Sequence, residues 1–178
     1  MEVISVKHKA DIIKGEYQFA DKVKSEVLSL LRTCNTIPQN SSNVKVSIHT
    51  EWQWESDNIT FRNLKSYIRE EIEKYYKPGR RCGGKRYYLH PTNFWANVYE
   101  KGDHAQSHNH QSTDYSFAYF VKTKWYDSPL IFTDSGKRVR PKEGTFVTFP
   151  AYLMHHVPKH RYNDTRITLS GNFTLDKI

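Results

Sequence analysis

The segment that decides the fold is residues 102–110, GDHAQSHNH, which carries three of the nine histidines in the chain. It has the pattern of a loop that enters a strand. In an extended chain, side chains two positions apart point to the same face, so His108 and His110 can both reach one atom between them. Neutral imidazole binds iron, zinc, copper and nickel. The spacing therefore predicts half of a metal site, although a His-x-His pair alone is equally consistent with two surface histidines on an edge strand.

A second histidine cluster ends the segment 149–157, FPAYLMHHV. It follows an apolar, strand-like stretch, so a packed sheet can deliver it to the first cluster. His155 and His156 are adjacent, and adjacent residues of a strand face opposite sides. We therefore expect one of them to reach the metal and the other to pack or meet solvent.

The composition favours a single β-rich domain. The chain has 178 residues, long enough to bury most of its apolar surface in one domain. Its 12 Tyr, 9 Phe and 4 Trp favour β structure. The formal net charge of +8 and the pI of about 9.4 suit an anionic partner. A nucleic-acid partner is nevertheless not favoured over a soluble basic surface, because no recognisable nucleic-acid motif accompanies the charge.

The sequence predicts a cytoplasmic protein, or one of the host cytoplasm if a phage encodes it. No apolar run approaches the ~20 residues of a membrane span, and the N-terminus lacks a signal-peptide core. Cys34 and Cys82 form no Cys-x-x-Cys pair, so a disulfide framework is not expected.

The first half of the chain has the periodicity of two helices and one strand. An apolar stripe begins at Ala20 and fades near Cys34, and a second stripe runs from Phe61 to a stop at Pro78-Gly79. Between them, residues 44–48 alternate like a half-buried strand. Residues 1–86 are therefore expected to support a core formed by residues 87–178.

The second half has the pattern of strands joined by turns. The expected strands cover residues 94–99, 115–121, 129–133, 145–149 and 166–173, with turns at 134–136 and 141–144. Many short strands with regular turns predict a mainly β sandwich or barrel with the two helices packed on its outside.

A basic segment, Lys77–Arg86, contains a near match to a phosphate-binding loop. Such a loop follows a strand, opens a helix and ends in a hydroxyl. Here the segment follows a helix, precedes a strand and has Arg86 at the hydroxyl position. We interpret it as a solvated basic loop that can still meet an anion.

Five short motifs follow one another in the second half: Trp95-Ala96-Asn97, Gly102-Asp103, His108-Asn109-His110, residues 149–157 and Arg166-Ile167-Thr168. In order and spacing, residues 87–175 resemble the 2-oxoglutarate and Fe(II)-dependent oxygenases, in particular a small type common in phage and marine bacterial genomes. The resemblance implies a double-stranded β-helix, a jelly-roll barrel like that of cupins, with iron at one mouth.

The resemblance also implies the iron ligands. The family's H-x-D/E position falls on His108 and His110, and its distal histidine falls on His155, with His156 as the alternate. Most of these enzymes bind Fe(II) with two histidines and a carboxylate. Because His110 stands where the carboxylate normally lies, we expect three neutral ligands, with Asp114 as the alternative.

The cosubstrate residues follow from the same resemblance. Arg166 is expected to bind the distal carboxylate of 2-oxoglutarate, since a buried anion needs a cation and a guanidinium can bind it bidentately. Alternation places Arg166 on one face with Thr168, and Ile167 on the other.

Asn97 and Tyr99 share a face on the strand that leads to the site, and Tyr119 is a similar candidate. These three are expected to hydrogen-bond the cosubstrate, although two polar core residues are an alternative interpretation of Asn97 and Tyr99.

The implied activity is hydroxylation of an unidentified prime substrate, a small molecule or a protein side chain, using Fe(II), 2-oxoglutarate and O2 and releasing succinate and CO2. Trp52, Trp54 and Tyr115 are candidates to line its approach. One alternative is a cupin-type metal enzyme or binding protein without 2-oxoglutarate, since Gly102, the histidine pair and Asp114 nearly reproduce the first cupin motif. Another is a non-enzymatic protein whose basic loop grips an anion.

Overall fold

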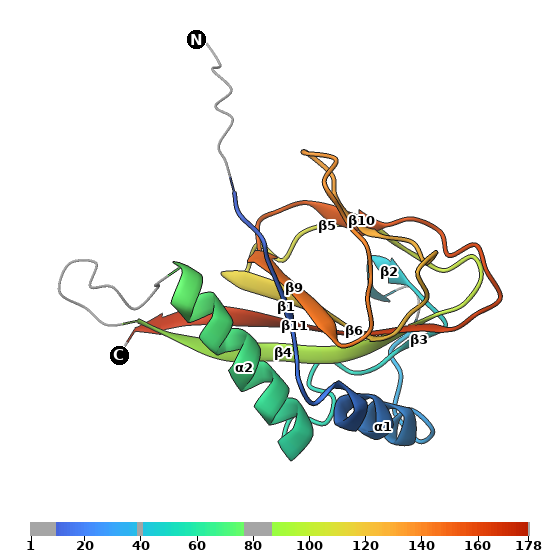
Figure 1. Ribbon diagram of the computed structural model, residues 1–178, viewed down its shortest axis with the longest axis horizontal. Coiled ribbons are helices and arrows are strands. Elements are labelled where there is room, and N and C mark those ends of the chain that lie inside the picture. The colour runs from blue at the N-terminus through green and yellow to red at the C-terminus, as the bar shows by residue number, and fades with distance from the viewer. Residues whose placement is uncertain (1–9, 39–40, 77–86, 178) are drawn as a thin grey trace, which may run out of the picture.

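Two antiparallel sheets face each other in the computed structural model, which describes residues 10–38, 41–76 and 87–177 (Figure 1). The predicted helix stop at Pro78-Gly79, Cys82 and the basic loop Lys77–Arg86 lie outside the described residues. The six-stranded sheet has the order β1 (Ile13–Glu16), β9 (Thr145–Pro150), β6 (Tyr115–Lys122), β11 (Arg166–Lys177), β4 (Tyr87–Tyr99) and β3 (Ile48–His49). The five-stranded sheet has the order β2 (Val44–Lys45), β5 (His104–His108), β10 (His155–Val157), β7 (Leu130–Phe132) and β8 (Arg138–Val139).

From β4 to β11 the chain alternates between the two sheets, except that β7 and β8 pair as a hairpin within one of them. This arrangement is the double-stranded β-helix that the sequence predicted. Side chains from both sheets meet in one apolar cluster, which joins Phe120 and Phe149 of the six-stranded sheet to Phe132 and Val157 of the other. This cluster fills the inside of the barrel. The barrel is therefore a packed core, and any cavity in it is bounded by fixed side chains.

The two predicted helices lie on the outer face of the six-stranded sheet (Figure 1). They are α1 (Ala20–Leu30) and α2 (Ile59–Tyr76). The Asn58 side chain caps α2 by accepting a hydrogen bond from the Thr60 N–H at 2.9 Å, and its amide donates to Glu26 of α1 at 2.8 Å. Val27 of α1 and Leu64 of α2 are fully buried against the sheet. This second core holds the sheet rigid from behind.

The central strand β11 confirms the predicted alternation. Ile167, Leu169 and Phe173 belong to the core under the helices. Arg166 and Thr168 point to the opposite face, inside the barrel. The strand therefore separates packing residues from polar residues at every second position.

The structure differs from the sequence-based expectation at residues 44–48. One strand was expected, but two short strands, β2 and β3, form there and join different sheets. Val44 and Val46 pack in the core inside the barrel, whereas Ile48 packs against the core under the helices. At the turn between the two strands, the Ser47 N–H and hydroxyl both donate to the Asp103 carboxylate, at 2.7 and 2.6 Å. The first 86 residues thus supply edge strands to both sheets, β1 included, as well as the helices.

The predicted strands of the second half are present, in several cases with longer bounds. β4 extends back to Tyr87 and β11 extends on to Lys177. The short strands β1 and β8 were not predicted, because two to four residues without clear alternation give no periodic signal. None of the described helices is long and apolar enough to cross a membrane.

The packing of β11 depends on a glycine. A Cβ at Gly171 would lie 2.5 Å from the Phe117 ring and 2.7 Å from the Asn93 carbonyl oxygen.

We expect Gly171→Ala to lower the free energy of unfolding by at least about 2 kcal/mol, because the added methyl must push apart two paired strands. Chemical denaturation measures it. Gly136→Ala is the control: that position has a φ of +66° but nothing within 4 Å, so only about 1 kcal/mol of backbone strain is expected. A loss at residue 171 no larger than the control would contradict the packing argument.

Candidate metal centre

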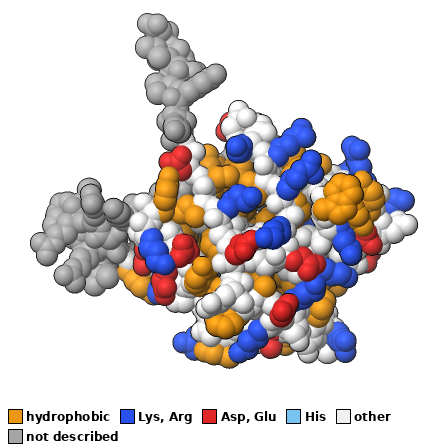
Figure 2. Space-filling model, viewed as in Figure 1, with side chains coloured by type: hydrophobic (Ala, Val, Ile, Leu, Met, Phe, Trp, Pro, Cys, Tyr) orange, Lys and Arg blue, Asp and Glu red, His pale blue; other side chains and the backbone are white. Residues whose placement is uncertain are grey.

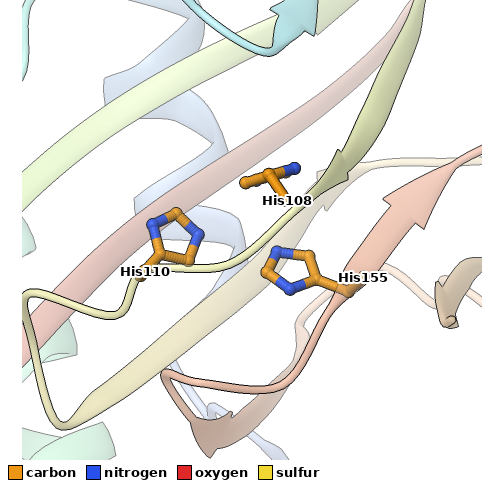
Figure 3. Close-up of side chains that lie close together, drawn as sticks. All are labelled: His108, His110 and His155. Atoms are coloured by element: carbon orange, nitrogen blue, oxygen red, sulfur yellow. The ribbon is translucent and has the colours of Figure 1, made fainter. Parts of the chain in front are cut away.

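Three histidines from separate parts of the barrel meet inside it (Figure 3). His108 ends β5, His155 begins β10, and the two are paired in register. His110 lies two residues past the end of β5. One ring nitrogen of each residue lies within 4.8 Å of the others, and the rings face a common point. The structure therefore brings together the three residues that the sequence proposed as ligands, with His110 held by a loop and not by the strand.

The loop position of His110 is fixed by backbone hydrogen bonds. Its N–H donates to the Ala151 carbonyl at 2.8 Å, and its carbonyl accepts from the Thr113 N–H at 2.8 Å. The loop is thereby tied to the turn before β10. These hydrogen bonds hold His108 and His110 close to β10, which carries His155.

Two of the histidines have the hydrogen bonds expected of metal ligands. The Nδ1 atom of His108 lies 2.7 Å from the Gln106 carbonyl, and that of His155 lies 2.9 Å from the Leu153 carbonyl. A carbonyl only accepts, so each Nδ1 carries the proton and each Nε2 keeps a free lone pair. Metal-binding histidines commonly donate their other N–H in this way. The donor set fits a divalent transition metal such as Fe(II).

The environment keeps these imidazoles neutral. Burial, with the neighbouring His155 and His108, lowers the pKa of His110 to about 3. Burial and His108 lower the pKa of His155 to about 4, and burial lowers the pKa of His108. A metal competes with protons for the same lone pairs, so neutral rings are ready to bind it at physiological pH.

The two alternate ligands lie outside this cluster. His156 points away, and its Nδ1 lies 3.1 Å from the Thr133 hydroxyl. The Asp114 carboxylate accepts a hydrogen bond from the Leu175 N–H at 2.7 Å, so it serves the end of β11. Neither belongs to the group of ligand atoms formed by His108, His110 and His155.

The histidines open into a cavity that also contains Arg166. Its side chain is 2% exposed, and the cavity wall includes Asn97, Tyr99 and Thr168. All four belong to the neighbouring strands β4 and β11, where Arg166 pairs with Tyr99 and Thr168 pairs with Asn97. The structure therefore places four of the five proposed cosubstrate residues in one cavity with the histidines.

Tyr119 is the exception. Its side chain lies in the core under the helices, on the other face of the sheet, and does not line the cavity. Burial raises the pKa of its phenol, and its hydroxyl has no partner among the described residues. The expectation that Tyr119 contacts a ligand is wrong. The cavity residue at this point of β6 is its neighbour Phe120, because alternation allows only one of two adjacent residues to face inward.

The Arg166 guanidinium is a buried cation that forms no ion pair among the described residues. Its Nη1 donates to the Ser128 carbonyl at 2.7 Å, while its Nε has no partner among the described residues. The guanidinium lies 4.9 Å from the Tyr99 ring centre and 5.8 Å from that of Phe120. Burial lowers its pKa, and the carboxylate of Asp127 raises it without forming an ion pair within the described part of the chain. A buried charge is costly when unpaired, so this position suits a ligand carboxylate.

Sequence reasoning missed two participants. The Ser128 carbonyl holds Arg166, but a backbone group leaves no mark in a sequence pattern. Trp95, quoted only as part of a motif, lines the cavity beside His110, with ring centres 5.9 Å apart. Its Nε1–H is buried without a partner in the described structure. The Trp-x-Asn spacing was the available signal, since it puts Trp95 and Asn97 on one face.

No protein-family model matches the sequence, and no curated protein matches it. Solved structures do match. The viral collagen prolyl hydroxylase of Paramecium bursaria Chlorella virus-1, in complex with 2-oxoglutarate, superposes with a TM-score of 0.68 at 11% identity, covering 91% of this chain and 94% of that one. A prolyl hydroxylase from Trichoplax adhaerens, bound to a peptide of hypoxia inducible factor, gives 0.65 at 13% identity over 92% and 83%. HygX from Streptomyces hygroscopicus, with nickel and 2-oxoglutarate bound, gives 0.61 at 11% identity over 93% and 83%.

These similarities confirm the predicted fold. Each of the three superpositions covers more than 80% of both chains. The chain has the double-stranded β-helix fold of 2-oxoglutarate-dependent oxygenases. At these identities the likeness concerns the fold, and the chemistry depends on the residues in the cavity.

Stability of the metal-free protein should depend on pH through the histidines. In the unfolded chain their pKa is near 6.5, above the values of about 3 and 4 for folded His110 and His155. Between pH 6.5 and 4 the unfolded state therefore binds more protons, and the free energy of unfolding should fall as pH falls through this window. Urea titrations at several pH values measure it. The variant with both His110→Asn and His155→Asn should show a shallower slope, and an equal slope would contradict the pKa shifts.

Measurements of metal binding can distinguish the three histidine ligands from nearby residues that do not bind the metal. We expect His108→Ala, His110→Ala and His155→Ala each to weaken Co(II) binding by more than about 100-fold, since loss of an outer partner alone costs 10–100-fold. His156→Ala and Asp114→Asn are matched controls that should retain it. The visible absorption of bound Co(II) provides the measurement. Loss of the spectrum in Asp114→Asn, with retention in His110→Ala, would assign the third ligand to the carboxylate.

Proposed function

We propose that the protein is a non-haem Fe(II)- and 2-oxoglutarate-dependent oxygenase that hydroxylates a prime substrate and releases succinate and CO2. The observation that carries the proposal is the Arg166 guanidinium, which is buried, forms no ion pair among the described residues and lies in the same cavity as three convergent histidines. A dicarboxylic acid can bind the metal with one end and pair with the Arg166 guanidinium at the other end. The fold supports the same conclusion, since two of the similar structures have 2-oxoglutarate bound.

In this proposal His108, His110 and His155 would hold Fe(II) through their ring nitrogens. With 2-oxoglutarate bound, the iron would supply the activation of O2 for hydroxylation. Three imidazoles bring no negative charge, so the site keeps the full charge of the metal and favours anionic ligands. The hydrogen bonds to the Gln106 and Leu153 carbonyls orient two of the rings.

Arg166 binds the distal carboxylate of 2-oxoglutarate. The Ser128 carbonyl uses one of its N–H groups and the Tyr99 ring lies against its face, which leaves the remaining donors for the carboxylate. The Thr168 hydroxyl and the Asn97 amide line the same wall. The Asn97 Oδ1 has no partner in the described structure, while its Nδ2 lies 3.5 Å from the Ser170 hydroxyl. The Thr168 hydroxyl and the Asn97 Nδ2–H can donate to the carboxylate, whereas the Asn97 Oδ1 only accepts and does not contribute.

The prime substrate enters through a cleft of about 350 Å³ beside the metal centre. The cleft shares His108, His110 and Trp95 with the inner cavity, and Trp52 and Asn109 extend its wall. Trp52 is 40% exposed and meets Trp95 edge to face, with ring centres 4.9 Å apart. Of the other aromatic candidates, Trp54 is buried in the core under the helices, and Tyr115 does not line this cleft.

A small molecule or a protein side chain suits the cleft as substrate. Its volume lies at the lower end of the range for ligand pockets, enough for one small molecule or one projecting side chain. The similar structures include a collagen prolyl hydroxylase and a hydroxylase bound to a peptide. We infer the same broad choice for this chain, with the protein acting in the cytoplasm or, if phage-encoded, the host cytoplasm.

A cupin-type metal protein without 2-oxoglutarate is the second candidate. The Gly102, histidine and Asp114 spacing supports it. However, it gives the buried Arg166 no partner, and it needs Asp114 as a ligand, whereas that carboxylate is bound to the Leu175 N–H. A non-enzymatic anion-binding protein is weaker still, because it leaves the histidine cluster without a role.

Anaerobic titration tests the proposal without turnover. Adding 2-oxoglutarate to the Fe(II) protein should produce a visible charge-transfer band, because its oxo acid group chelates the metal. Arg166→Ala should raise the dissociation constant by about 100-fold, since removing a buried charge-assisted hydrogen bond costs about 3 kcal/mol. Arg138→Ala, an exposed arginine of β8, is the matched control and should change nothing.

Two outcomes would overturn the proposal. If the metal-loaded protein gives no band, the cupin alternative is favoured. If Arg166→Ala binds 2-oxoglutarate as tightly as the wild type, the buried cation has another purpose. Thermal unfolding in parallel shows whether the variant remains folded, and Arg166→Lys tests whether charge alone suffices.

A further inference from the structure

Two buried ionisable side chains, Asp127 and His160, have no part in the proposed metal site. Asp127 lies in the loop between β6 and β7, and His160 lies in the loop between β10 and β11. Both side chains are 1% exposed, and the distance between Asp127 Oδ1 and His160 Nδ1 is 3.9 Å. Neither atom has a hydrogen-bond partner among the described residues. Buried polar atoms are costly without a partner, so this pair needs a physical explanation.

The hydrogen bonds of the His160 ring show where its protons lie. Its Nε2 is 2.6 Å from the Asp164 carbonyl oxygen, and a carbonyl only accepts, so Nε2 carries a proton. With this proton alone, the His160 Nδ1 is an acceptor that faces another acceptor, the Asp127 carboxylate oxygen. A second proton on Nδ1 makes the ring a cation and gives both buried atoms a partner.

The backbone holds both residues in these positions. Asp127 Oδ2 accepts from the Lys124 N–H at 2.8 Å, and the Asp127 N–H donates to the Lys124 carbonyl at 3.1 Å. The His160 N–H donates to the Asp103 carbonyl at 2.7 Å, and its carbonyl accepts from the Gly102 N–H at 2.8 Å. Together with the hydrogen bond of the ring, these contacts keep the imidazole opposite the carboxylate.

Asp127 connects this pair to the cosubstrate cavity. The next residue, Ser128, accepts a hydrogen bond from Arg166 Nη1 on its carbonyl oxygen at 2.7 Å. Burial lowers the pKa of Arg166, while the nearby Tyr99 and Asp127 act in the opposite direction. The Asp127 carboxylate therefore interacts electrostatically with the guanidinium, although the two form no ion pair among the described residues.

Other charged and titratable groups of the surrounding loops have their own partners or face solvent. The Asp164 carboxylate accepts from the Tyr126 hydroxyl, and the Asp103 carboxylate accepts from Ser47. The Tyr162 ring centre lies 6.3 Å from that of His160, and the Tyr162 side chain is exposed. Charges of both signs are interspersed on the surface in Figure 2, where salt screens them. The exposed charged residues of these loops are Glu100, Lys101, Lys124, Lys159 and Arg161.

We propose that Asp127 and His160 hold a proton between them and thereby set the charge of the cosubstrate cavity. The inference rests on the proposed function. With the proton present, the imidazolium balances Asp127, and the positive charge of Arg166 remains available for the distal carboxylate of 2-oxoglutarate. When the proton leaves for solvent, the unbalanced Asp127 carboxylate lowers the positive potential at Arg166. The cosubstrate therefore binds less tightly as pH rises through the range in which imidazoles lose their charge.

His160 is a positioning residue in this proposal, because it does not line the cavity and acts through Asp127. Two simpler roles make different predictions. If the pair only joins two loops, its loss lowers stability without making cosubstrate binding independent of pH. If a water molecule donates to both acceptors, His160 stays neutral and the charge of Asp127 does not change with pH.

Anaerobic titration of the Fe(II) protein with 2-oxoglutarate at several pH values tests the proposal. Between about pH 6.5 and 8.5 we expect the dissociation constant to rise about tenfold, because buried charges are screened little by salt. The carboxylates of the ligand stay ionised in this range. The pKa values of about 3 for His110 and about 4 for His155 lie below it, so these ligands do not contribute.

Variants show which group causes the change with pH. His160→Gln should bind with the weaker, high-pH affinity throughout. Asp127→Asn keeps an acceptor for the Lys124 N–H and should bind tightly throughout. The double variant should recover the affinity of Asp127→Asn, because without the carboxylate there is no charge for His160 to balance. His90→Gln removes an exposed histidine of β4 and should follow the wild type.

The ring nitrogens of His160 provide a measurement that does not involve 2-oxoglutarate. In the Zn(II)-loaded protein, nitrogen-15 NMR should show protons on both nitrogens at about pH 6.5 and loss of the Nδ1 proton as pH rises. The spectrum of His160→Gln assigns the signals. Thermal unfolding shows whether each variant is folded, and the wild-type spectrum and pH profile decide the question if His160→Gln is not.

Three results contradict the proposal: a dissociation constant that does not change with pH, a double variant that binds as weakly as His160→Gln, and a His160 ring that carries a single proton at about pH 6.5. Absence of the charge-transfer band in the wild type at every pH overturns the proposed function instead, and with it any effect on cosubstrate affinity. The NMR spectrum then still decides whether Asp127 and His160 hold the proton.

Discussion

One buried positive charge organises the interior of this protein. Arg166 begins the central strand β11, and its guanidinium lies inside the barrel against the Tyr99 ring, where it donates a hydrogen bond to the Ser128 carbonyl. A cation in that position is tolerable only where the rest of the fold supplies compensation or a ligand does. The two cores, one inside the barrel and one under the helices, keep the strand that carries it in place.

The metal centre depends on a different kind of restraint. Its three imidazoles come from β5, from the loop after it and from β10, so backbone pairing of His108 with His155 sets most of the geometry. Burial keeps the rings neutral, which lowers the cost of assembling them without an ion and prepares them to bind one. In the proposed Fe(II) site all three imidazoles are neutral, so the negative charge that balances a divalent ion would come from other ligands. The positive charge of the neighbouring Arg166 also favours an anionic ligand in this cavity.

The periodicity of apolar residues was enough to predict a helix or strand where the pattern repeated several times. The helical stripes starting at Ala20 and Phe61 and the alternation around Ile167 and Leu169 correspond to α1, α2 and β11, because each repeats often enough to define a buried face. The local pattern failed where packing against two different cores decided the path of the chain. Val46 packs inside the barrel and Ile48 packs against the core under the helices, so an apparently single strand is divided between two sheets. Tyr119 was expected on the wrong face of β6 for a related reason. Which of its alternate residues face the cavity depends on how β6 pairs with neighbouring strands, and not on the residues of β6 alone.

The sequence by itself determined the ligand chemistry: two histidine groups, one arginine on a polar face, and a β-rich chain able to bring them together. Only the tertiary structure decided that His155 and not His156 joins the cluster, that Asp114 caps β11, and that Trp125 remains on the surface. The physical reason is that side-chain type and periodicity are local properties, whereas direction, burial and the supply of hydrogen-bond partners depend on which strands pair and in what register.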